Sequence, residues 1–463
     1  MSKIEVDQIT QQSGTTVTVG GGACKTAVVD ATTVTLGRSG GTVQLASGAS
    51  QSGFGRSGSV NWQTTPKTAT FTAVNGEGYF INQGSAITAN LPAGSAGAIV
   101  AFSDYARNFG TYNFTIAPNG SEKVGGIAQD LKLNVDGQAV TLVYVDSTKG
   151  WVNVQNSKDT QTGTSFTVAT GGTITTSGDY KIHTFTGPGT FCVSAVGAPT
   201  NTADYLVIAG GGGGGFCMGG GGGAGGYRES PGSASGCYTV SPLGTSPATA
   251  LTLAVQGYPI TVGGGGGGGS SNHDRGCSGS VSTFSTISSA GGGGGGARPT
   301  SSPNNTLGLA GGSGGGNAND SPSGNVNPAG NTPPVTPPQG QPGGTGRGSN
   351  TSQNYSGGGG GATGAGNNGG PGDRSGCGGA GATSSINGTP TGRAGGGSGG
   401  IYSAGGHSKG TASDGGGVGG PGATNGTVNT GGGGGGAGHP ADGGTQNGGT
   451  GGSGVVIIRY KFQ

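Results

Sequence analysis

The sequence predicts an all-β protein with an N-terminal trimeric β-stalk, an antiparallel β-sandwich, and a small β base into which a lattice of polyglycine helices is inserted. Two observations favour strands: short apolar segments alternate with polar residues at period two, and Gly, Asn, Asp or Ser bounds them. A third observation, the uneven distribution of glycine, divides the chain into two parts. Of the 119 glycines, 29 lie in residues 1–200 and the other 90 in residues 201–463. Gly has no side chain to bury, so the second part cannot form a conventional core.

The composition excludes several classes of protein. Only 29% of residues are hydrophobic and 8% charged, and the net charge is +2. Without a basic stripe we expect no nucleic-acid binding, and without a long apolar run we expect no membrane insertion. The opening MSKIEVDQITQQSG lacks the pattern of a signal peptide, which favours assembly in a cytoplasm. In a reducing compartment the cysteines are expected to be apolar fillers rather than disulfides: Cys24, Cys192, Cys217, Cys237, Cys277 and Cys377.

Residues 1–64 carry three short strand-like segments, TTVTV (15–19), TTVTL (32–36) and TVQLA (42–46), and LGRSG at 36 returns as FGRSG at 54. Strands this short bury too little apolar surface to stand alone. Wound around two sister chains, they would share one core. The region is therefore predicted to be a trimeric β-stalk that attaches the protein to its assembly, with an ordinary two-sheet domain as the alternative.

Residues 65–157 are predicted to form an antiparallel β-sandwich, because eight strand-like segments follow one another at a spacing of about ten residues with turn signals between them. Trp62 and Trp151 fall at the edges of this block. We expect both to pack in the core or its rim, with a ligand-stacking platform as the alternative. The eight segments are 68–74, 78–81, 86–91, 98–102, 113–117, 131–135, 139–145 and 151–155.

Residues 158–463 are predicted to be a glycine-rich head on a β base. The base would contain 164–209, 249–262 and 454–463. The terminal GVVIIRYKFQ is strongly apolar and needs a sheet to join. Its expected partner is YLVIA (205–209), at the other end of the glycine region. TALTLAVQGYPITV (249–262) is a third candidate strand of the same sheet.

Glycine runs of five to seven residues recur within 210–454, between segments rich in Pro, Asn, Ser and Thr. A flexible linker is the ordinary interpretation of such sequence. The regular lengths, the turn formers and the flanking strands favour an ordered lattice instead. Polyglycine in an extended helix with three residues per turn has no internal hydrogen bonds, so neighbouring helices can satisfy its N–H and C=O groups.

Several of these motifs resemble phage proteins. NWQTTPKTATFTAVNGEGYFINQ (61–83) and VTLVYVDSTKGWVNVQ (140–155) are similar to a module of phage tail-fibre and virion proteins, especially of marine phages, as is the opening of the chain. YLVIAGGGGGG (205–215) with GVVIIRY (454–460) resembles a glycine-rich C-terminal domain common in phage proteins and, less closely, the tip adhesins of T-even-like phages. In those phages the adhesin is a separate protein, whereas here stalk and head share one chain.

If the lattice forms, its variable connections would carry the function, as loops do on other rigid scaffolds. Run 210–215 would lead away from the base, so the Phe-Cys-Met turn at 216–218 would lie at the far tip. Runs 263–269 and 291–296 would also lead outward and 311–316 would return, with the connection 317–342 near the base. An apolar turn at a tip would mark a contact surface or pack on a neighbouring loop. The expected receptor-binding residues are Phe216, Met218, His273, Arg275, Arg298 and Tyr355.

Nothing in the sequence predicts catalysis, and we expect no cofactor and no metal. The acidic residues are dispersed, whereas a glycan-cleaving enzyme needs two carboxylates in one cleft. The GxGxxG matches follow from composition alone, and GGHSKGT (405–411) has the wrong spacing for a phosphate loop. The four histidines lack ligand spacing.

The resemblance therefore implies a non-enzymatic tail-fibre protein of a virion, assembled in the host cytoplasm. It would be a homotrimer that joins other virion proteins through its N-terminus, and its head would bind a host surface protein or glycan. A purely structural fibre or decoration protein is the main alternative. A glycine-rich antifreeze or cell-wall protein is a weaker one, because it would not need the β base or the module at 61–155.

Overall fold

The computed structural model describes residues 60–155, 166–197, 201–236, 238–270, 274–298, 305–319, 326–347, 355–370, 374–402, 407–439 and 446–462. The chain divides into two units, Met1–Ser59 and Val60–Gln463. The expected stalk at 1–64 lies almost wholly outside the described residues. Within them the protein is all-β, with strands and no α-helix, as predicted.

The first described domain, residues 60–155, contains all eight expected strands and one more, Asn61–Lys67. This extra strand begins before the expected boundary at residue 65, because it pairs with the strand at 77–81. The nine strands are β1 Asn61–Lys67, β2 Phe71–Thr72, β3 Glu77–Ile81, β4 Thr88–Asn90, β5 Ile99–Asp104, β6 Phe114–Ala117, β7 Leu131–Leu133, β8 Ala139–Asp146 and β9 Gly150–Asn153.

This domain is a two-sheet sandwich, but it is not antiparallel throughout. One sheet has the order β1-β3-β5-β8-β9 and the other β2-β4-β6-β7. The pairs β1·β3, β3·β5, β2·β4 and β4·β6 are parallel, and only the later pairs are antiparallel. The first six strands therefore coil, each turn giving one strand to each sheet. Parallel strands need a crossover, and here the strand in the opposite sheet supplies it. Strand spacing alone cannot distinguish such a crossover from a hairpin.

The core of the sandwich lies between its two sheets. Trp151, Phe102, Phe109 and Phe114 are fully buried in it. Trp151 thus packs in the core as expected. Trp62 is 40% exposed, and its ring stacks on Phe80 with 4.9 Å between centroids. It therefore covers the outer face of β3 rather than filling the core.

The head, residues 166–462, is built on a second pair of sheets. Their orders are β11-β12-β22-β14-β15, with β16 also paired to β14, and β10-β13-β17-β18-β19; β20 and β21 form a separate hairpin. The strands are β10 Val168–Thr170, β11 Thr173–Ser177, β12 Tyr180–Phe185, β13 Gly189–Ala195, β14 Thr202–Ile208, β15 Tyr227–Glu229, β16 Leu251–Thr252, β17 Gly257–Thr261, β18 Ser282–Phe284, β19 Ile287–Ser289, β20 Ala382–Ser384, β21 Thr391–Arg393 and β22 Val455–Lys461.

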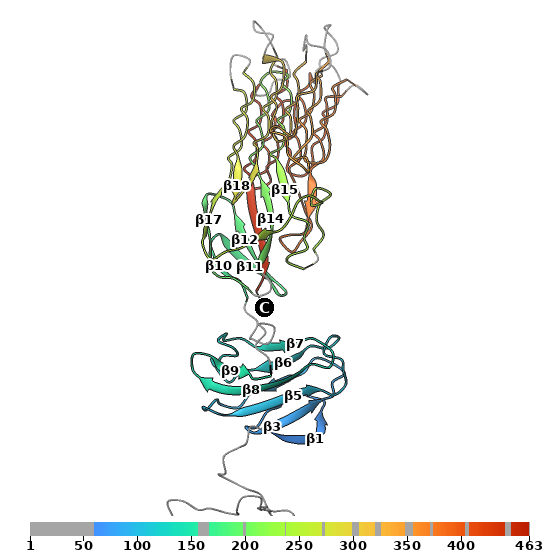
Figure 1. Cartoon of the computed structure of the whole chain (residues 1–463). Helices are drawn as coiled ribbons and strands as arrows, with labels where there is room; N and C mark the ends of the chain where they lie inside the picture. The colour runs from blue at the N-terminus through green and yellow to red at the C-terminus, as the bar shows by residue number, and fades with distance from the viewer. Residues whose placement is uncertain are drawn as a thin grey trace, which may run out of the picture. The chain divides into compact units, whose positions relative to one another are not determined.

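The predicted pairing of the two apolar segments is confirmed. β14 and β22 are antiparallel neighbours, with Tyr205 opposite Ile458 and Ile208 opposite Val455 (Figure 1). One face of these strands packs into the core between the two sheets, and the other packs on alanines of the glycine region and on Ile386. Burial on both faces explains why LVI and VVII are continuous apolar runs rather than alternating ones.

Candidate functional site

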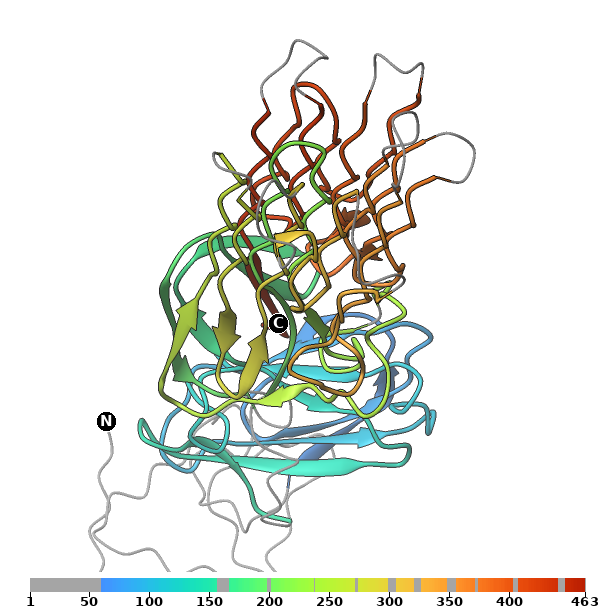
Figure 2. The ribbon, with the colours of Figure 1, turned by 90° about the horizontal axis from the view of Figure 1, so that it is seen from above.

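The glycine runs leave the strands as rods that lie side by side (Figures 1 and 2). Run 210–215 directly follows β14 and is buried. Its N–H groups donate hydrogen bonds of 2.8–3.0 Å, with a period of three residues, to 277–280, 449–452 and 220–223. Its carbonyls accept with the same period from 292–295, 266–269 and 434–437. Six neighbours at period three are what a helix with three residues per turn allows.

This packing has no room for side chains in its interior. A Cβ added at Gly211, Gly212 or Gly213 would overlap a carbonyl oxygen of a neighbouring run. At the edge of the packed runs, some positions do have room for a side chain. In run 263–269, Gly263, Gly266 and Gly269 are buried, while a Cβ on Gly264 or Gly267 would meet nothing within 4 Å. Gly265 and Gly268 are not buried, but a Cβ on either would overlap the carbonyl oxygen of Gly451 or Gly448, so in this run only Gly264 and Gly267 have room for a side chain.

The hydrogen bonds also give the direction of each run. Gly266 and Gly269 donate to Gly211 and Gly214, so run 263–269 leads outward, parallel to 210–215 as expected. Run 291–296 does the same, since Gly292 and Gly295 donate to the carbonyls of Gly210 and Gly213.

The expected return by 311–316 is wrong. Gly312 donates to Gly291 and Gly296 donates to Gly316, so run 311–316 leads outward again. The chain returns through 305–309, where Ala297 donates to Asn305 and Leu309 donates to Gly294. A count of glycine runs misses this segment, because an edge run needs few glycines. The expected base connection 317–342 is only partly near the base. Gln339 lies at β15, where it accepts from Tyr227 at 2.8 Å, but Asn317 follows the outward run and Asn319 donates to the Ser356 hydroxyl, which contacts Met218 at the far turn.

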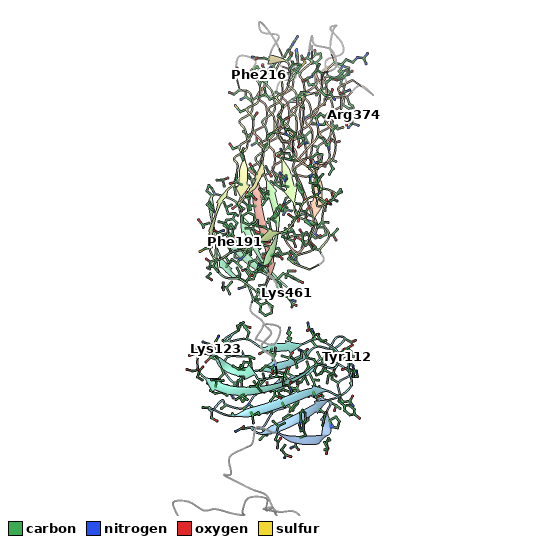
Figure 3. The ribbon with its side chains drawn as sticks, viewed as in Figure 1. Tyr112, Lys123, Phe191, Phe216, Arg374 and Lys461 are labelled. Carbon is green, nitrogen blue, oxygen red and sulfur yellow. The ribbon has the colours of Figure 1, made fainter. Side chains whose placement is uncertain are left out.

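The turn at 216–218 lies at the end of the runs farthest from the strands, as Phe216 shows in Figure 3. Cys217 and Met218 have positive φ angles of 45° and 52°, which reverse the chain sharply. Met218 is fully buried and Cys217 is 2% exposed, whereas Phe216 is partly exposed. Met218 donates its N–H to Gly438 at 3.1 Å and accepts from the Ser356 hydroxyl. Met218 is thus a packing residue, and its assignment as a receptor contact is wrong.

Tyr355 is also placed at this end but is not available to a receptor. It is 1% exposed, and its hydroxyl lies 3.0 Å from Nδ1 of His407. Its backbone bridges Arg347 and Ile401. Its assignment as an exposed contact is therefore wrong, because the lattice surrounds this ring with neighbouring segments.

The predicted arginines remain candidates. Arg275 and Arg298 are partly exposed, and burial lowers the pKa of Arg275 below its usual value. Burial raises the pKa of the Cys217 thiol, and the nearby Arg298 opposes that shift. Arg298 thus lies beside the turn at 216–218. His273 lies outside the described residues.

A comparison with protein families decides how the head is classified. A family model described as a glycine-rich domain matches residues 184–461, more than half of the chain. The chain belongs to this family. The glycine-rich domain so defined begins in β12 and ends with Lys461, the last residue of β22, so its ends are held by adjacent strands. A search of curated proteins finds no match.

The described residues contain no group of three or more His, Cys, Asp or Glu side chains that could hold a metal ion. They also contain no helix of the length and apolar character that a membrane crossing requires.

Proposed function

We propose that this member of the glycine-rich domain family is a non-enzymatic fibre protein of a phage virion, whose head attaches to the host surface by the end farthest from the β base. The observation that carries the proposal is that outward glycine runs alternate with antiparallel return segments, such as 291–296 with 305–309, so that the connections between them gather at that end. A rigid scaffold that presents many loops together is a common arrangement for recognition.

The resemblance of 61–83 and 140–155 to tail-fibre proteins supports the phage assignment. The proposal includes a location in the virion, where the protein would be a homotrimer joined to other virion proteins by its N-terminal region. Burial of Met218 and Tyr355 bears on the kind of receptor, because it removes two of the three expected apolar or aromatic contacts. Phe216 and the polar side chains at this end remain, which favours a glycan over an apolar protein surface.

The experiment compares adsorption of the purified protein to host cells with its thermal melting. Replacing Arg298 or Phe216 with Ser is expected to reduce adsorption and leave the melting temperature nearly unchanged, because both side chains are partly exposed. Lys181→Ser, in β12 among the base strands, is the matched control and should adsorb normally.

A purely structural role in the virion is the second candidate. The burial of Cys217 and Met218 favours it, since their backbone N–H groups donate to Gln446 and Gly438 and thereby tie neighbouring segments together. This role predicts that adsorption is unchanged by all three substitutions, while particle assembly or stability is altered. Normal adsorption by the folded Arg298 and Phe216 variants would overturn the adhesin proposal at these residues.

A further inference from the structure

A polar hollow lies on the side of the head, at the edge of the packed runs. It has a volume of about 500 Å³ and is open to solvent. Arg374, which helps to line it, projects from the outer surface in the half of the head away from the strands (Figure 3). The hollow is lined by Asn327, Gly366, Asn367, Asn368, Arg374, Ser375 and Cys377.

The lining combines one cation with several neutral amides. No carboxylate and no aromatic ring is among the lining residues. Arg374 donates from Nη2 to Sγ of Cys377 at 2.9 Å, and its Nε is buried without a partner among the described residues. Its other terminal nitrogen, Nη1, has no hydrogen bond within the described chain and can serve a ligand. The side-chain amides of Asn327 and Asn367 likewise make no hydrogen bond within the described chain.

The backbone behind the hollow is held firmly. Asn367 donates to the carbonyl of Cys377 at 3.0 Å and accepts from Gly358 at 3.0 Å. Asn368 accepts from the N–H of Thr345 at 2.8 Å, and Ser375 accepts from that of Gly410 at 2.8 Å. The lining residues are thus positioned before a ligand arrives, which lowers the entropic cost of binding.

We propose that this hollow binds a carboxylate-bearing pyranose, such as a uronic acid unit of a surface polysaccharide. The inference rests on the proposed host-binding function and names its ligand class. Sugar hydroxyls both donate and accept, as the Asn amides do. The single guanidinium matches the single charge of a carboxylate. The volume lies within the range of roughly 300–1,000 Å³ usual for small-ligand sites.

Sequence reasoning missed this site because its residues come from three separate edge segments. The only local signal is the pair Asn367–Asn368 followed closely by Arg374, in a region otherwise poor in charge. Such a signal does not show that Asn327 joins them.

The test is calorimetric titration of the full chain with oligogalacturonate, its methyl ester and inorganic phosphate. The wild type should bind oligogalacturonate, and methyl esterification should weaken binding by about 10- to 100-fold, because it removes the charge that Arg374 recognises. Arg374→Gln should lose a similar factor. Asn367→Ala should weaken the acid and its ester alike. Lys409→Gln, which removes a neighbouring cation outside the lining, should bind as the wild type, and thermal melting verifies that each variant is folded.

Three results would overturn the inference. The first is that the wild type does not bind oligogalacturonate. The second is that it binds the acid and the methyl ester equally. The third is that inorganic phosphate binds as tightly as the sugar. Adsorption to host cells distinguishes a failure of the uronic-acid inference from a failure of the adhesin proposal. If cells adsorb the wild type and the Arg374→Gln variant equally, the hollow is not the receptor site and the adhesin proposal stands.

Discussion

Most interior glycines of the head exclude a side chain for the same reason: a neighbouring backbone carbonyl occupies the place of the Cβ. Gly266 and Gly267 are consecutive members of one edge run, yet they differ in this respect. A Cβ on Gly266 would overlap the carbonyl oxygen of Cys277, and one on Gly267 would meet nothing within 4 Å. Sequence position alone cannot tell these two glycines apart.

Gly266→Ala should therefore destabilise the head by about 1–3 kcal/mol, as overpacking of a close-packed interior does. Gly267→Ala should be neutral or stabilise by up to about 1 kcal/mol, because Ala restricts the unfolded chain. Gly294→Val, deep inside a run, should prevent correct folding. Thermal melting of the three variants tests this. Equal tolerance at Gly266 and Gly267 would contradict the packing described here.

Met218 shows that an apolar side chain at the end of a lattice can still be interior. Met218→Ala is expected to cost about 2–5 kcal/mol of unfolding free energy, the range for truncating a buried Met. Val428→Ala is the control, since Val428 is 68% exposed and its change should stay within about 0.5 kcal/mol. Denaturant titration measures both. A small effect at Met218 would mean that its pocket collapses around the alanine.

At the scale of elements, β22 holds the head together. It pairs with β12 on one side and β14 on the other, although about 250 residues separate β14 from it in sequence. Its residues Val456 and Ile458 pack in the core between the sheets, and Val455 and Ile457 pack toward the glycine region. The strand thus closes both the sheet and the long insertion between its neighbours.

Removing residues 455–463 should leave the glycine region without a fixed end and expose two apolar faces. We expect the truncated chain to lose protease resistance across 210–454, while the sandwich at 60–155 stays resistant. Removal of Gln463 alone is the control and should change nothing. A head that keeps its resistance without β22 would show that the runs support themselves.

His183 in β12 makes the base sensitive to acid. It is fully buried and in contact with β22, with its Nδ1 2.7 Å from the Gly171 carbonyl and its Nε2 3.2 Å from the Tyr460 hydroxyl. Because a carbonyl only accepts, Nδ1 carries the proton and Tyr460 donates to Nε2. Burial lowers the pKa of His183 below its ordinary 6.5.

The sign of the effect follows from proton binding. Below about pH 6.5 the unfolded chain binds a proton at this residue that the folded chain does not, so stability falls as the pH drops toward the lowered pKa. The slope contributed is at most about 1.4 kcal/mol per pH unit. Between pH 7 and 5, the free energy of unfolding should fall more steeply with decreasing pH for the wild type than for His183→Gln. Identical slopes would show that His183 binds a proton as readily in the folded chain as in the unfolded chain.

At the scale of the whole molecule, the chain joins a coiled β-sandwich to a head whose interior is backbone. Short strands in residues 1–59 remain predicted to form a trimeric stalk, since each alone would bury too little apolar surface. The full chain should therefore sediment as a homotrimer. Deletion of residues 1–59 should yield a folded monomer, and circular dichroism verifies the fold. A full chain that sediments as a monomer would require attachment through a partner protein instead.

The sequence by itself determined the all-β class, the eight expected strands of the sandwich and the pairing of YLVIA with GVVIIRY. These follow from local alternation of apolar residues and from the need of an apolar strand for a partner. It also located the 216–218 turn at the far end. Run 210–215 starts at the base strand that precedes it, so the turn that follows the run must lie away from the base.

Only the tertiary structure decided the parallel coil of β1 to β6, the return through 305–309, and the burial of Met218 and Tyr355. Each depends on which distant segments become neighbours. Hydrogen bonds between runs are formed by backbone groups that every residue carries, so the side-chain pattern holds little information about pairing. For the same reason the hollow beside Arg374 could be found only after its three segments had been placed.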